Sequence, residues 1–157
     1  MKKIFIIMLV FSFIFGSISY GETIKIFEAR NKIFNESNKI RSGLKDSKNI
    51  LLMTSMWDTC LVAVKQVDAY FYMIRIFDTI DPKNIKEEAV ISLENWLNNI
   101  KKTDIVNIDS LNGLMKNEEA LEAKAALYMT NLKEYFVELN KEIDMEIERL
   151  KEIKIQF

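Results

Sequence analysis

The chain has 157 residues and a formal net charge of −1, with 22 Lys and Arg against 23 Asp and Glu. This balance lacks the basic footprint of nucleic-acid-binding domains, so we expect no nucleic-acid partner. The sequence has no His and a single Cys, which excludes His-ligated haem, His-containing zinc sites, Ser-His and Cys-His nucleophile pairs and an internal disulfide.

Residues 1–21 have the three parts of a secretory signal peptide. Two lysines precede the apolar block Ile4 to Phe15, and small residues follow at alternate positions up to Gly21. The block has about 12 residues, against the roughly 20 that a spanning helix requires. We therefore expect cleavage after Ser19 or, preferably, after Gly21, and a periplasmic or secreted location. The mature protein, residues 22–157, is predicted to be one domain, with membrane attachment only if the signal segment stays uncleaved.

The mature chain is predicted to be all-α, because its one Pro and two Gly are too few for the turns of a β-rich domain. An amphipathic helix is expected over about residues 24–44, and Gly43 suits its C-terminal end. Asp46 or Ser47 can cap the second helix, about 47–80. The apolar stripe of this second helix leaves only a narrow polar strip. We therefore expect it to be surrounded, as the central element of the core.

A third helix, about residues 82–102, is expected to begin at Asp81-Pro82. Asp favours the cap position, and Pro favours the first helical position. The following segment, residues 103–116, is irregular by pattern and has an Asn-Gly turn signal at Gly113. It is predicted to connect the third and last helices, with at most a short helical turn.

The last helix, about residues 117–156, can be capped by Asn117, and its apolar stripe keeps a helical period to the end. Some 40 residues at about 1.5 Å each would reach roughly 60 Å. That length exceeds a compact bundle of this mass. We therefore expect this helix to project at its end or to kink.

Four amphipathic helices with mostly short connections predict an antiparallel four-helix bundle. Residues 25–48 are mainly basic and residues 117–157 mainly acidic, so the first and last helices should be neighbours. The alternative fuses the first two helices through Gly43 and gives a three-helix, coiled-coil-like hairpin.

A candidate metal site lies on the second helix. Met53, Met56 and Cys60 follow one another at i, i+3 and i+7 and so share one helical face. Thioether and thiolate donors suit Cu(I), which an exported protein can meet. The competing interpretation is that Met and Cys fill the core.

A candidate ligand site lies further along the same helix, where Asp68, Tyr72 and Arg75 follow one another at i, i+4 and i+7. An Arg beside aromatic side chains can clamp a small carboxylate by bidentate hydrogen bonding and stacking. The competing interpretation is a solvated or interhelical ion pair on the polar strip.

The last helix carries Glu134, Glu138, Glu142 and Glu146 at i+4 spacing. Aligned carboxylates can collect a hard cation such as Ca²⁺. Carboxylates one turn apart rarely converge on one ion, however, and nearby basic residues can neutralise them. We therefore predict a solvated face.

The sequence contains no catalytic motif, cofactor motif or phosphate-binding loop, so we expect neither an enzyme nor a cofactor. Its abundance of Ile, Lys and Asn is typical of an AT-rich bacterial genome. Export and long amphipathic helices indicate a protein that binds other proteins in the cell envelope, as an adaptor, chaperone-like or inhibitor-like component. Its partner would be an envelope protein or a second copy. The alternative is a small-ligand or soft-metal (copper) binding module of the periplasm.

The predicted contact surface is the distal part of the last helix, where the apolar stripe is expected to outrun the core. This strip would mediate self-association or partner binding. Its residues are Ile143, Ile147, Leu150, Ile153 and Phe157.

Overall fold

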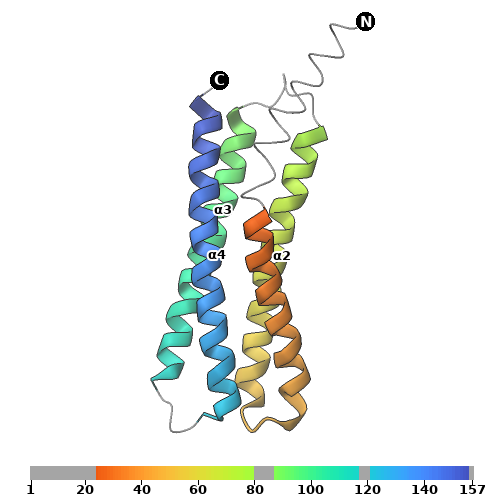
Figure 1. The fold of residues 1–157 in the computed structure, drawn as a ribbon, viewed down its shortest axis with the longest axis vertical. Coiled ribbons are helices and arrows are strands. Elements are labelled where there is room, and N and C mark those ends of the chain that lie inside the picture. The colour runs from red at the N-terminus through yellow and green to blue at the C-terminus, as the bar shows by residue number, and fades with distance from the viewer. Residues whose placement is uncertain (1–23, 80–86, 117–120, 156–157) are drawn as a thin grey trace, which may run out of the picture.

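The described part of the chain forms four antiparallel helices, packed as in a four-helix bundle (Figure 1). The computed structural model describes residues 24–79, 87–116 and 121–155, so the predicted signal peptide and the predicted helix start at Asp81-Pro82 lie outside it. The elements are α1 (24–43), the one-turn helix η1 (Leu44–Asp46), α2 (Ile50–Thr79), α3 (Glu87–Met115) and α4 (Ala123–Ile155). The all-α prediction is confirmed. The three-helix alternative is wrong, because α1 and α2 are separate helices that pack antiparallel.

One hydrophobic core runs along the bundle. Each helix turns inward a stripe of apolar side chains spaced three and four residues apart, which places them on one face. The largest fully buried side chains come from all four helices and include Ile33, Tyr70, Leu97, Met129 and Phe136.

Gly43 closes α1, as predicted, but without a left-handed conformation. Its φ and ψ are −86° and −10°, in the right-handed region. The residue lies at a close approach of three helices. A Cβ at this position would be 3.1 Å from Met53 Cε of α2 and 3.2 Å from Lys124 Nζ of α4. A larger residue here would require these two flexible side-chain ends to shift by a few tenths of an ångström.

The segments that start α2 and α4 cap each other. Asn49 precedes α2 and Glu122 precedes α4, and the backbone N–H of Glu122 donates to Asn49 Oδ1 over 3.0 Å. In return, the Glu122 carboxylate accepts from the Lys48 N–H at 2.7 Å and from the Ser47 hydroxyl at 2.9 Å. Ser47 Oγ also accepts from the Asn49 N–H at 3.0 Å. The predicted Ser47 is thus part of the cap, whereas Asn49 takes the cap position and Asp46 belongs to η1.

Loss of this cap is expected to loosen two helix ends at once. Asn49→Ala removes the acceptor of the Glu122 N–H, and N-cap replacements of this kind cost about 1 kcal/mol. Free energies of unfolding from urea titrations measure the change. Asn99→Ala is the matched control, because Asn99 is exposed within α3, and it should change stability by less than about 0.5 kcal/mol. Equal losses in the two variants would contradict the capping role.

Helix α3 is longer than the sequence predicts. Residues 103–116 are expected to be irregular, but α3 includes all of them up to Met115. Its buried face continues through Asp104 and Leu111 at helical spacing, and packing against α4 overrides the weak local signal. Gly113 has no positive φ, so the Asn-Gly pair makes no turn. The prediction of a connecting segment here is therefore wrong.

Helix α4 is about as long as α2 and α3 and does not outrun them. It has 33 residues, and α2 and α3 have 30 and 29, so their lengths differ by only a few residues at about 1.5 Å each. Figure 1 shows α3 running alongside α4 over most of its length. The expectation of a projecting end is therefore wrong. The predicted cap Asn117 lies outside the described residues.

The predicted neighbour relation between the first and last helices is confirmed. Lys32 Nζ of α1 lies 2.6 and 2.7 Å from the two carboxylate oxygens of Glu138 on α4. The Asn131 amide of α4 donates to the buried Glu36 of α1 over 2.8 Å. An exposed ion pair contributes under about 1 kcal/mol. The charges therefore act on the arrangement more than on stability.

Helix α2 occupies a corner of the bundle and is not surrounded. Among the described residues it is the one helix long and apolar enough, by length and composition alone, to cross a membrane (Ile50–Ile76). Only 33% of its most apolar stretch is buried. The prediction of a surrounded core helix is wrong, because every helix of a four-helix bundle has an outer side. On α2 this outer side is unusually apolar and includes Leu51, Tyr72 and Ile76.

Candidate functional site

The candidate metal residues Met53, Met56 and Cys60 share one face of α2, and this face turns into the core. All three side chains are buried. Burial raises the pKa of the Cys60 thiol to about 12, so the thiol is protonated at neutral pH, whereas a metal needs the thiolate. The arrangement therefore favours core packing over Cu(I) binding.

The structure does not bring Asp68, Tyr72 and Arg75 together as a clamp. The Asp68 carboxylate accepts from Arg30 of α1, from Nε at 2.9 Å and from Nη2 at 2.7 Å. The Arg30 guanidinium also lies 5.1 Å from the centre of the Phe34 ring. Tyr72 and Arg75 are exposed. Asp68 therefore belongs to an ion pair between two helices, as in the competing interpretation.

The distal stripe of α4 is covered by the core. Ile143, Ile147 and Leu150 are all buried, so the expectation that they are exposed is wrong. This part of α4 packs against the first half of α3, where Lys101 pairs with Asp144, and against α2, where Tyr70 donates to Glu146. The side chains of Ile153 and Phe157 lie outside the described residues.

The run of glutamates on α4 is not a solvated face throughout, because Glu142 and Glu146 are buried. Glu146 accepts from the Tyr70 hydroxyl of α2 at 2.5 Å and from Arg149 Nε at 2.7 Å. Burial and the Glu146 carboxylate raise the pKa of Tyr70 above its ordinary value. This cluster ties α2 to α4. Among the described Cys, Asp and Glu residues, no group of three or more is placed to hold a metal ion.

Asp104 of α3 is a buried acid that the sequence analysis missed. It is fully buried, and neither carboxyl oxygen has a hydrogen-bond partner in the described part of the chain. Burial raises its pKa to about 8, so the carboxyl is mainly neutral at pH 7. The available signal was its position on the apolar stripe, four residues after Ile100 and seven before Leu111, in a segment predicted to be irregular.

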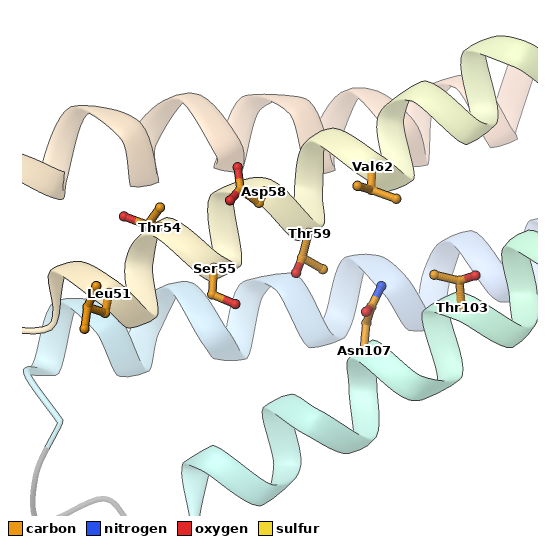
Figure 2. A pocket seen from close by; sticks show the side chains of 8 residues that line it. All are labelled: Leu51, Thr54, Ser55, Asp58, Thr59, Val62, Thr103 and Asn107. Carbon is orange, nitrogen blue, oxygen red and sulfur yellow. The ribbon is translucent and has the colours of Figure 1, made fainter.

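A groove of about 470 Å³ lies between α2 and α3 (Figure 2). In Figure 2, Ser55 and Thr59 lie on the side of α2 nearer α3, Asp58 lies on its outer edge, and Asn107 points from α3 toward α2. The groove therefore has polar side chains at its centre and apolar ones at its ends. Its lining residues are Leu51, Thr54, Ser55, Asp58, Thr59, Val62, Thr103 and Asn107.

One hydrogen bond anchors α3 to α2 one helical turn beyond Val62, a lining residue of the groove. At the anchor, Trp96 Nε1 of α3 donates to the carbonyl oxygen of Gln66 on α2 over 3.0 Å. Eight residues further along α3 is Asp104, and eight residues back along α2 is Asp58. In antiparallel helices these two positions are at the same height. Asp58 therefore lies on the edge of the groove, and Asp104 lies buried at the same height along the bundle.

Asp58 supplies the charge of the groove. It is the one charged side chain among the eight lining residues, and it has no hydrogen-bond or ion-pair partner among the described residues. The hydroxyl protons of Thr54 and Thr103 are not free to bind a ligand, since they are donated to carbonyls of their own helices at 2.8 and 3.0 Å. Asp104, being mainly neutral, adds little charge.

The sequence analysis did not find this groove, because it depends on how two helices pack and not on a motif. Its lining has the residue types of a recognition surface, with no nucleophile and base in contact. Comparison with known proteins found no matching family model, no matching curated protein and no matching solved structure.

Proposed function

We propose that this chain is an exported, non-enzymatic bacterial protein that acts by binding a protein partner in the cell envelope, as an adaptor, chaperone-like or inhibitor-like component. The partner docks an amphipathic helix in the groove between α2 and α3. This surface replaces the distal stripe of α4, whose described residues are buried.

The observation that carries the proposal is the apolar rim of the groove. Leu51 is 85% exposed and Val62 is 49% exposed, although both belong to the most apolar helix of the bundle. Exposed apolar surface bordered by polar groups is typical of protein interaction sites.

The spacing of the rim residues favours a helix as the occupant. Leu51 and Val62 are 11 residues apart, which places them on one face of α2 about 16 Å from each other. A second helix lying along α2 meets both with residues at the same spacing. Helix-in-groove binding of this kind uses apolar anchors on one helical face.

Site-specific cross-linking tests the proposal. A photo-reactive amino acid at position 51 is expected to give a discrete protein adduct in cells that express the full chain. A second substitution, Val62→Glu, should remove that adduct, because a carboxylate on the rim disfavours apolar docking. The mass of the adduct identifies the occupant. An adduct with a second copy of this chain would mean that the protein self-associates through the groove and that the occupant is not a different protein.

Position 127 is the matched control. Leu127 is also exposed, but it shares a face of α4 with Glu138, which contacts α1 through Lys32. That face is away from the groove. The same adducts from positions 51 and 127, or none from position 51, would contradict docking in the groove.

A further inference from the structure

Asp58 lies within the apolar strip that an incoming helix would cover. It follows Leu51 by seven residues and precedes Val62 by four, so the three side chains share one face of α2. All three line the same groove. Any helix that contacts both apolar rim residues therefore passes over the Asp58 carboxylate.

Covering this carboxylate with an apolar side chain is unfavourable, because a charge removed from water needs a counter-charge and hydrogen bonds. The described part of the chain offers Asp58 neither. The partner has to supply them. Within the groove, Ser55, Thr59 and Asn107 add oxygen acceptors on the side toward α3, which suit the several N–H donors of a cationic side chain.

We propose that the groove recognises a Lys or Arg side chain on the partner helix, placed between two apolar anchors and paired with Asp58. The inference rests on the proposed function and names the chemistry of its partner. The spacing on α2 sets the partner's pattern: two apolar residues 11 positions apart, with the cation four residues from one and seven from the other. Which anchor is nearer depends on the direction of the helix.

A displayed library of helical peptides tests this pattern. The peptides carry two fixed Leu residues 11 positions apart, with the positions between them randomised. They are selected against the full chain, and binders that still bind Leu51→Glu are discarded. On the wild type, Lys or Arg should be enriched four or seven residues from an anchor. On Asp58→Asn the enrichment should disappear, and on Asp58→Lys it should change to Asp or Glu.

Asp109→Lys is the matched control, because Asp109 is exposed on α3 but does not line the groove. It makes the same change in net charge as Asp58→Lys and should keep the Lys and Arg preference. A selected peptide is then compared with its norleucine analogue. The cationic peptide should bind the wild type about tenfold more tightly, and Asp58→Asn should remove the difference.

Two results would overturn the inference. Binders that depend on Leu51 but show no cationic preference would remove the role of Asp58 and leave docking in the groove intact. Absence of any Leu51-dependent binder would remove the helix pattern itself. In that case the cross-linking at position 51 shows separately whether the proposed function fails as well. Circular dichroism of the Asp58 variants confirms that the exposed substitutions leave the fold unchanged.

Discussion

Asp104→Asn is expected to stabilise the protein at neutral pH. Burial raises the pKa of the Asp104 carboxyl to about 8, whereas Asp in an unfolded chain titrates near about 3.9. Between these values the folded chain holds a proton that the unfolded chain has lost, so its free energy of unfolding falls as the pH rises. The stabilisation that the Asp104 proton provides is fully present below about pH 4 and is lost by about pH 8. At about 1.36 kcal/mol per pH unit, up to about 4 kcal/mol is lost at pH 7.

Asn is similar in shape and cannot ionise, so the variant avoids this loss. We expect a gain of about 2 to 4 kcal/mol at pH 7 and little difference from the wild type at pH 4. Urea unfolding of both proteins between pH 4 and 9 measures the difference. Asp109→Asn, exposed on the same helix, should follow the wild type. If the difference between Asp104→Asn and the wild type stays constant with pH, Asp104 does not hold its proton in the fold.

The helices and one neighbour relation were predictable because they depend on repeated signals. Apolar residues at steps of three and four mark an inward face whatever the neighbours are. The basic first helix and acidic last helix indicate adjacency in the same way, and the contact between Lys32 and Glu138 agrees with it. Signals of this kind are summed over many residues, so an error at one position changes little.

Two errors in the sequence analysis share one cause. A single Asn-Gly pair at Gly113 was enough to predict a loop, yet α3 continues through it because its buried face packs against α4. With its end predicted at about residue 102, α3 was made too short. The same shortening hid Asp104, because a residue expected in a loop is not expected in a core. Local turn signals compete with tertiary packing, and here packing prevailed.

Which charged residues face inward was not predictable from spacing. Glu134 and Glu146 occur in one run at i+4 intervals, but Glu134 is exposed and Glu146 is fully buried. Four-residue steps drift around a helix by about 40° each, so a long run cannot keep one environment. The groove was equally hidden, because it depends on how α2 and α3 pack together and not on either helix alone.

Arg149→Met is expected to have the largest destabilising effect of the substitutions considered. Arg149 donates to Glu146 from Nε at 2.7 Å and from Nη2 at 2.5 Å, and Glu146 is fully buried. Removing the guanidinium leaves a buried carboxylate that keeps the Tyr70 hydroxyl as a donor but has lost its counter-charge. Breaking a buried pair from one side costs about 3 to 5 kcal/mol.

The test of this mechanism is to remove the charge that the substitution leaves behind. Glu146→Leu and Tyr70→Phe, combined with Arg149→Met, replace the whole cluster by apolar side chains and should recover most of the lost stability in urea unfolding. Lys151→Met is the control, since Lys151 pairs with Glu148 on the exposed side of the same helix, and it should leave stability unchanged. A triple variant as unstable as Arg149→Met would mean that lost packing, and not the unpaired carboxylate, causes the destabilisation. Recovery would instead show that the cluster contributes little net stability and serves to fix the register of α2 against α4.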